Sequence, residues 1–159
     1  MTEALCRALA DALRSQGLML TTAESCTGGL IAAACTELAG SSDWFERGFV
    51  TYSNAAKNEL LGVDAALIAR HGAVSHAVAE AMAQGALQHA QADCAIAVTG
   101  VAGPGGGSPE KPVGTVWIAW QTPNRRLVTR HQFAGDRAAV RAATVEQALR
   151  TLLRLLQGN

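Results

Sequence analysis

Apolar, β-prone runs alternate with helix-forming runs through the first hundred residues, and this alternation limits the fold more than any other feature of the chain. Amphipathic or Ala-rich segments favour helices, whereas short runs rich in β-branched and aromatic residues favour strands. The predicted helices cover residues 3–16, 28–38, 55–61, 64–70, 75–89 and 136–156. The predicted strands cover residues 18–22, 47–53, 93–99, 113–121 and 126–133.

The last two predicted strands follow each other through a short turn at residues 122–125, which indicates an antiparallel hairpin. Strands separated by helices favour parallel pairing instead. Both kinds of connection together predict an α/β protein, a three-layer α/β/α sandwich with a mixed central sheet. The chain has 159 residues and no repeat or linker, so we expect one domain over residues 1–159.

Composition narrows the class of partner. Hydrophobic residues make up 49% and charged residues 16%, a balance that excludes a disordered chain. The 13 Lys and Arg match 13 Asp and Glu, and no basic block occurs, which argues against nucleic acid as a partner. We find no apolar run of membrane-spanning length and no signal-peptide pattern, so we expect a cytoplasmic protein without a membrane partner.

The four cysteines, at positions 6, 26, 35 and 94, form no C-x-x-C pair and no metal-ligand spacing with any histidine. We therefore expect no metal site. Cys26 stands at the start of a predicted helix, where the pKa of a thiol would fall. Because no histidine partner can be assigned to Cys26, it ranks below its neighbour Ser25 as a nucleophile.

Ser25 lies between a predicted strand and a predicted helix. A hydroxyl at such a junction can face unpaired backbone N–H groups, here those of Cys26, Thr27 and Gly28. These groups would form an oxyanion hole beside a serine nucleophile. The competing interpretation is a helix N-cap, a common role for serine, and this segment alone favours it.

A serine nucleophile needs a base, and no histidine lies in a segment that obviously meets Ser25. A lysine can replace histidine where burial lowers its pKa. Tyr52 lies near the end of a predicted strand and Lys57 about one turn into the following predicted helix, so both can reach the sheet edge where Ser25 lies. Tyr52 would relay a proton or orient Lys57. Taken singly, each residue fits an ordinary surface or packing role equally well.

The loop at residues 100–107 is the segment richest in glycine, and it directly follows a strong predicted strand. Such loops let the backbone approach a ligand closely. The candidate binding residues here are Thr99, Gly100, Gly103 and Gly105. The segment matches neither a Walker A motif nor a dinucleotide fingerprint, and a plain surface loop is the alternative.

Two arginines, Arg137 and Arg141, share one face at the start of the last predicted helix, for which Asp136 is the expected cap. Arginine suits bidentate contacts with phosphate or carboxylate. A solvated helix face is the alternative for at least one of them. Glu24 could orient Lys57, cap a helix or pair with an arginine, and spacing does not choose among these roles.

Five segments in order resemble the motifs of the CinA C-terminal domain family, known for nicotinamide-nucleotide amidohydrolase activity. They lie at residues 22–29, 52–57, 72–75, 99–104 and 112–116. The family pattern usually has Ile where Val101 stands and often an acidic residue where His76 stands. The chain is similar to the stand-alone form, which lacks the additional N-terminal domain of longer members.

The resemblance implies hydrolysis of nicotinamide mononucleotide to nicotinic acid mononucleotide and ammonia, without metal or cofactor. Carried over by motif, Ser25 is the nucleophile, Lys57 the general base and Tyr52 its partner. We expect Thr99 and the glycine-rich loop to hold the nucleotide.

Three alternatives remain open from the sequence. They are a non-catalytic nucleotide-binding module, an amidase or esterase acting on another substrate, and a structural domain that pairs with another protein. The apolar content and the final helix are compatible with a homodimer.

Overall fold

Five strands form one mixed sheet in the order β2-β1-β3-β4-β5 in the computed structural model, which describes residues 2–159. The strands are β1 (Leu20–Glu24), β2 (Phe45–Val50), β3 (Cys94–Gly100), β4 (Thr115–Gln121) and β5 (Arg126–Gln132). The first three strands run parallel, and β3, β4 and β5 pair antiparallel. The carboxyl ends of β1, β2 and β3 therefore meet at one edge of the sheet.

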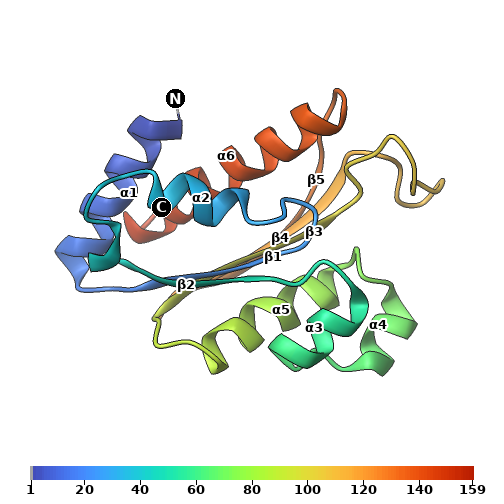
Figure 1. The fold of residues 1–159 in the computed structure, drawn as a ribbon, viewed down its shortest axis with the longest axis horizontal. Coiled ribbons are helices and arrows are strands. Elements are labelled where there is room, and N and C mark those ends of the chain that lie inside the picture. Colours follow the sequence, from blue (N-terminus) through green and yellow to red (C-terminus); the bar gives the residue numbers. More distant parts are fainter. Residues whose placement is uncertain (1) are drawn as a thin grey trace.

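Helices cover both faces of this sheet (Figure 1). One layer contains α1 (Thr2–Gln16), α2 (Leu30–Thr36) and α6 (Arg137–Leu156), and the other contains α3 (Asn54–Leu61), α4 (Ala65–His71) and α5 (His76–Gln88). A short 3₁₀ turn, η1 (Ser41–Asp43), precedes β2. The predicted α/β class and three-layer arrangement with a mixed sheet are confirmed.

The central strand β3 shows why two cores form. Its side chains alternate across the sheet, so Ile96 and Val98 join the core under α1, α2 and α6. Ala95 and Ala97 face the core under α5 instead. α5 also approaches α3 closely, because a Cβ built at Gly85 would stand 2.0 Å from the Leu61 carbonyl oxygen.

Two boundaries around Ser25 differ from the prediction. β1 begins and ends two residues later than expected and reaches Glu24, immediately before the serine. α2 begins at Leu30 rather than at Gly28, because Gly28 and Gly29 have φ values of +57° and +104°. This left-handed backbone is incompatible with a right-handed helix. Ser25 is therefore not the N-cap of α2, and a turn separates it from the helix.

Side-chain caps fix the other helices near the site. Ser75 accepts a hydrogen bond from the Val78 N–H at the start of α5, and Asp136 accepts one from the Ala139 N–H at the start of α6. Both predicted caps are confirmed. Ser53 caps α3 in the same way, which places Lys57 one turn inside that helix.

Candidate active site

Ser25 and Lys57 are in contact at the edge of the sheet where the parallel strands end. Their Oγ and Nζ atoms are 3.1 Å apart. Ser25 follows β1 directly, and Lys57 lies on α3, which begins four residues after β2 ends. Because β1 and β2 are parallel neighbours, the topology brings these residues together across 32 positions of sequence.

The surroundings of Lys57 combine burial with hydrogen-bond acceptors. Its side chain is only 1% exposed, and burial lowers the pKa of the ammonium from its ordinary value of 10.5. Nζ donates to the backbone carbonyls of Thr51 at 3.1 Å and Tyr52 at 3.2 Å. Among residues 2–159, no ion pair includes Lys57. Nζ also donates to Ser25 Oγ, and loss of one proton from Nζ would free a lone pair for the Ser25 hydroxyl.

Tyr52 contacts the pair through its backbone. Its carbonyl oxygen lies 3.4 Å from Ser25 Oγ and accepts from Lys57. Its side chain is 61% exposed, and the phenolic oxygen accepts a hydrogen bond from Arg137 Nη2 at 3.3 Å. Arg137 also donates from Nη1 to the Gly103 carbonyl at 2.8 Å. Arg137 therefore links Tyr52 to the glycine-rich loop.

The turn after Ser25 leaves backbone N–H groups free. The Gly28 N–H already donates to the Ser25 carbonyl at 3.0 Å. The N–H groups of Cys26 and Thr27 have no hydrogen-bond acceptor within residues 2–159. Cys26 itself is buried, and burial raises the pKa of its thiol to about 11. The expectation of a lowered Cys26 pKa is wrong, because desolvation outweighs the effect of nearby cations.

Two charged side chains, Arg141 and Glu24, form hydrogen bonds with this turn. Arg141 donates from Nε to the Cys26 carbonyl at 3.2 Å and from Nη2 to the Thr27 carbonyl at 3.3 Å. Glu24, 1% exposed, accepts from the Thr27 hydroxyl and from two backbone N–H groups of α2. Of the three roles open to Glu24, the structure shows the helix cap.

The residues expected to bind a ligand near the third strand have different surroundings. Thr99 is buried, and its hydroxyl donates to the Ala73 carbonyl at 2.9 Å. A Cβ at Gly100 would stand 2.7 Å from Val116 Cγ2, so tight packing requires glycine there. Gly105 is exposed, with no atom within 4 Å of a built Cβ.

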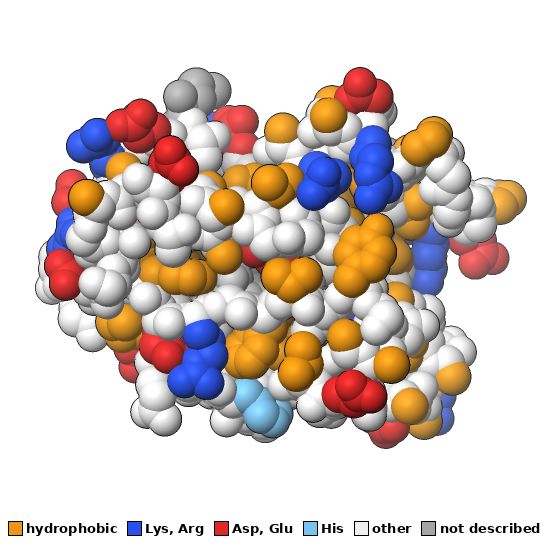
Figure 2. Space-filling view, viewed as in Figure 1, with side chains coloured by type: hydrophobic (Ala, Val, Ile, Leu, Met, Phe, Trp, Pro, Cys, Tyr) orange, Lys and Arg blue, Asp and Glu red, His pale blue; other side chains and the backbone are white. Residues whose placement is uncertain are grey.

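Exposed apolar side chains lie near Ser25. Of the four large apolar side chains exposed within residues 2–159, Leu30, Val50 and Tyr52 lie beside the Ser25 turn. Val50 pairs in register with Glu24, and its Cγ2 would be 3.4 Å from a Cβ at Gly29. Figure 2 shows basic side chains over the amino-terminal end of α6, next to hydrophobic ones on the same face. This surface therefore combines exposed apolar side chains with basic ones.

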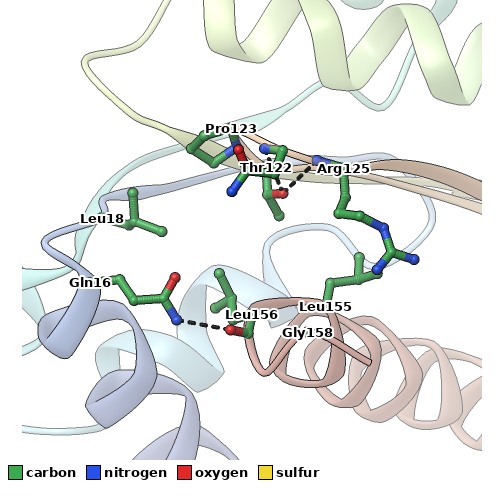
Figure 3. A pocket seen from close by; sticks show the side chains of 9 residues that line it. Gln16, Leu18, Thr122, Pro123, Arg125, Leu155, Leu156 and Gly158 are labelled. Atoms are coloured by element: carbon green, nitrogen blue, oxygen red, sulfur yellow. Dashed lines mark hydrogen bonds between the residues drawn. The ribbon is translucent and has the colours of Figure 1, made fainter.

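A surface cleft lies away from Ser25 and Lys57. The cleft in Figure 3 has a volume of about 410 Å³ and is lined by the β4–β5 turn and the ends of α1 and α6. It lies at the opposite end of the sheet, because Gln121 pairs with Ala95 near the start of β3. Its lining holds no Ser, Cys, Lys, His or carboxylate side chain. Chemistry rather than size therefore identifies the candidate site.

Neither a metal cluster nor a bilayer-crossing helix occurs in the described part of the chain. No group of three or more His, Cys, Asp or Glu side chains within residues 2–159 is arranged to hold a metal ion. No helix of these residues is both long and apolar enough to cross a membrane.

The family model of the CinA C-terminal domain matches residues 2–156. The chain belongs to the CinA C-terminal domain family. The curated relatives include a protein of Escherichia coli K12 that is 55% identical over 143 residues, which cover 89% of this chain and 87% of the relative. A Pseudomonas putida protein is 56% identical over 147 residues, or 92% of each chain. Both are named nicotinamide-nucleotide amidohydrolase PncC.

Solved structures of the CinA family share this fold. The competence/damage-inducible protein CihA of Agrobacterium tumefaciens superposes with a TM-score of 0.94 at 49% identity, covering 97% of this chain and 94% of that one. The competence damage-inducible protein A (ComA) of Klebsiella pneumoniae gives a TM-score of 0.95 at 45% identity, covering 98% of this chain and 97% of that one. The arrangement of layers and strands is therefore that of known family members.

Sequence reasoning missed the backbone part of the site. The Thr51 and Tyr52 carbonyls that hold Lys57 belong to groups that every residue carries, so no side-chain pattern reveals them. The role of Glu24 has a weaker sequence signal, because the residue stands six positions before α2 and not at the usual N-cap position. Which of the three roles Glu24 has is shown only by its hydrogen bonds in the structure.

Proposed function

We propose that the protein is an amidohydrolase that converts nicotinamide mononucleotide and water to nicotinic acid mononucleotide and ammonia. The observation that carries the proposal is the 3.1 Å contact between Ser25 Oγ and the buried amine of Lys57. The names of the relatives supply the substrate, since proteins 55% and 56% identical to this chain are named nicotinamide-nucleotide amidohydrolases.

In the proposed mechanism, Ser25 Oγ attacks the carboxamide carbon while neutral Lys57 accepts the hydroxyl proton. The N–H groups of Cys26 and Thr27 hold the oxyanion, and removing one such donor typically costs roughly 3 kcal/mol of transition-state stabilisation. Lys57 then gives the proton to the departing nitrogen, which leaves as ammonia. A water molecule gives a proton to Lys57 and attacks the Ser25 ester; the bond from the acyl carbon to Oγ breaks, Lys57 returns the proton to Oγ, and the carboxylic acid is released.

The remaining candidate residues bind and position the substrate in this proposal. The exposed apolar surface of Leu30, Val50 and Tyr52 takes the flat pyridinium ring, for which an aromatic face is a favourable partner. Arg137, which is exposed at the start of α6, contacts the phosphate. Tyr52 assists Lys57 through its carbonyl, and the glycine-rich loop near Gly103 borders the nucleotide.

Ammonia release from nicotinamide mononucleotide tests the proposal directly. The wild type should release ammonia, whereas Ser25→Ala and Lys57→Ala should be inactive although folded. Ser15→Ala, which removes an exposed hydroxyl on α1, is the matched control and should retain full activity. Full activity in Ser25→Ala would refute the nucleophile.

A substrate panel separates the alternatives. A non-catalytic binding module would bind the nucleotide without releasing ammonia. An amidase with another substrate would hydrolyse unrelated amides faster than nicotinamide mononucleotide. Comparing the nucleotide with nicotinamide riboside and free nicotinamide shows whether the phosphate contributes to recognition.

A further inference from the structure

Glu24 is a buried carboxylate that the proposed mechanism does not use. It is the last residue of β1 and directly precedes Ser25. Within residues 2–159 no ion pair includes it. An isolated buried charge is costly unless hydrogen bonds compensate it. The arrangement of its hydrogen bonds therefore indicates what the residue is for.

Both carboxylate oxygens of Glu24 are used across the Ser25–Gly29 turn. Oε1 accepts from the Thr27 hydroxyl at 2.5 Å and from the Ile31 N–H at 2.9 Å, and Oε2 accepts from the Ala32 N–H at 3.0 Å. Hydrogen bonds to a charged acceptor are about twice as strong as neutral ones. One side chain thus ties the end of β1 to the middle of the turn and to the first turn of α2.

The backbone of Glu24 is fixed as well. Its carbonyl accepts from the Thr51 N–H at 2.8 Å, and the next N–H, of Ser25, donates to the Val98 carbonyl at 3.1 Å. The residue is therefore anchored to both neighbouring strands. α2 lacks any side-chain cap of its own, because its N-cap is Gly29. Apart from a backbone hydrogen bond from the Leu30 N–H to the Thr27 carbonyl at 3.0 Å, Glu24 provides the contacts between Thr27 and the start of α2 within residues 2–159.

These contacts determine which N–H groups stay free. The carboxylate takes the donors of Ile31 and Ala32, and the Ser25 carbonyl takes that of Gly28. The N–H groups of Cys26, Thr27 and Gly29 are left available, and those of Cys26 and Thr27 lie nearest to Ser25 in the chain. We propose that Glu24 is a positioning residue for hydrolysis at Ser25, and this inference rests on the proposed function. Its carboxylate holds the turn so that these two N–H groups face the oxyanion.

Thr27 provides the cleanest test, because its hydroxyl contacts Glu24 whereas its backbone belongs to the oxyanion hole. Thr27→Val keeps the shape but removes the hydrogen bond. Since small displacements of a reacting group cost much of the rate, we expect kcat to fall about tenfold. KM should not change, because ground-state contacts remain. Thr27→Ser restores a hydroxyl and should recover most of the lost rate.

Three further measurements exclude a merely structural effect. Thr36→Val is the matched control, since it removes a hydroxyl bond at the other end of α2 and should behave as the wild type. Glu24→Gln should lower kcat more than Thr27→Val, and adding Thr27→Val to it should cause no further loss. Urea unfolding of each variant gives the folded fraction by which kcat is corrected.

A fluorophosphonate probe makes the test independent of the substrate. Ser25 Oγ displaces fluoride from phosphorus, its proton passes to Lys57, and the phosphoryl oxygen occupies the oxyanion position. The labelling rate should fall in Thr27→Val and recover in Thr27→Ser. Labelling without hydrolysis of nicotinamide mononucleotide would overturn the proposed function alone. Wild-type kcat and labelling in Thr27→Val would overturn the role of Glu24, and a wild type that shows neither reaction would overturn both.

Discussion

Replacing Lys57 with methionine should remove both amide hydrolysis and a pH dependence of folding stability. The reasoning begins with the 1% exposure of Lys57 and its two carbonyl partners. Burial lowers the pKa of the ammonium, so the amine becomes the stable form at a lower pH than in a solvated lysine. Only the amine can accept the Ser25 proton.

The expected change in rate follows from this titration. Below the pKa of Lys57, each pH unit should cost about a factor of ten in kcat/KM, because the neutral fraction falls in that proportion. Above the pKa the profile should be flat. Removing the base in Lys57→Met should lower kcat by about 10²- to 10⁴-fold, the usual contribution of general-base catalysis. Lys57→Arg should be equally inactive, because a guanidinium keeps its proton.

The stability change has a definite sign. The folded pKa is lower than the unfolded value near 10.5, so between the two values the unfolded chain binds the extra proton. The free energy of unfolding should therefore rise with pH in that window, by at most about 1.4 kcal/mol per pH unit. Below the folded pKa the desolvation penalty is fully present. This pH dependence should be absent in Lys57→Met.

Two assays check these expectations. Ammonia release measured between about pH 5 and about pH 10 gives the rate profile. Urea unfolding over the same range gives the free energy of unfolding. Lys111→Met is the matched control, because Lys111 is the only other lysine and lies far along the chain in an exposed loop. A wild-type kcat/KM that does not fall on the acid side would refute a neutral Lys57 as the base. The same conclusion would follow if the free energy of unfolding changed with pH equally in the wild type and in Lys57→Met.

Three further outcomes follow from the site and the core. Arg137→Ala should raise KM for nicotinamide mononucleotide but not for nicotinamide riboside, and an equal rise for both would show that Arg137 does not bind the phosphate. Tyr52→Phe keeps the carbonyl and the ring, so it should affect KM more than kcat; a selective loss of kcat would instead assign a proton relay to the phenol. Gly85→Ala should lower the urea midpoint, since its Cβ would stand 2.0 Å from the Leu61 carbonyl oxygen, and overpacking of this kind typically costs about 1–3 kcal/mol. An unchanged midpoint would mean that α5 can move away from α3.

The sequence predicted the fold class well because local signals agreed with the tertiary arrangement. Alternating strands and helices followed by a hairpin allow few topologies, and all five strands occur where residue patterns placed them to within a few positions. The exception at α2 has a local cause. Gly28 and Gly29 were included in the helix, although their left-handed φ values delay its start to Leu30.

The site was only partly predictable, for a different physical reason. Ser25 and Lys57 were identified as a pair from residue chemistry and family resemblance, and the structure places them 3.1 Å apart. The hydroxyl of Tyr52 was expected near Lys57, yet the side chain bonds Arg137 and the backbone carbonyl approaches Lys57. Tyr52 lies in the connection between β2 and α3, and which of its groups faces Lys57 depends on the backbone conformation of this connection, which tertiary contacts set.

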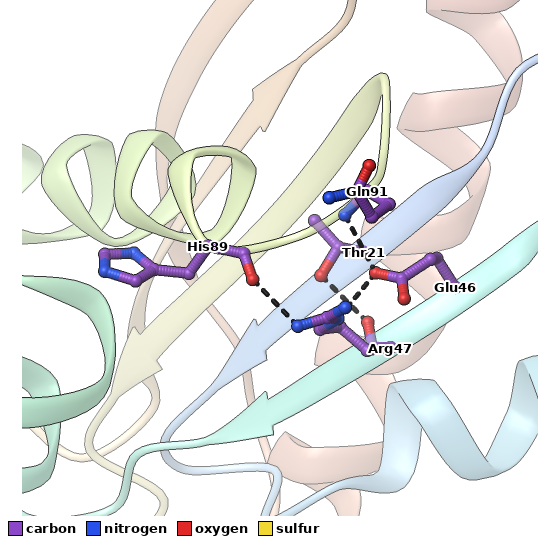
Figure 4. Close-up of polar contacts among 5 residues, drawn as sticks. All are labelled: Thr21, Glu46, Arg47, His89 and Gln91. Atoms are coloured by element: carbon purple, nitrogen blue, oxygen red, sulfur yellow. Dashed lines mark hydrogen bonds and ion pairs between the residues drawn. The ribbon is translucent and has the colours of Figure 1, made fainter.

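The register between β1 and β2 aligns Ser25 with Lys57. Leu20 lies opposite Phe45 but Thr21 lies opposite Arg47, so Glu46 is an extra residue in β2. Its carboxylate accepts from the Gln91 N–H and pairs with Arg47, which donates to the His89 carbonyl (Figure 4).

These contacts anchor the bulge to the segment that follows α5. With the bulge, Glu24 lies opposite Val50, and Ser25 is level with Thr51. A slip by one residue would move the carbonyls that hold Lys57 by about 3.3 Å along the sheet. That displacement is about as long as the Ser25–Lys57 contact itself. The bulge at the start of β2 is therefore a condition for the proposed reaction at Ser25, beyond the end of β2.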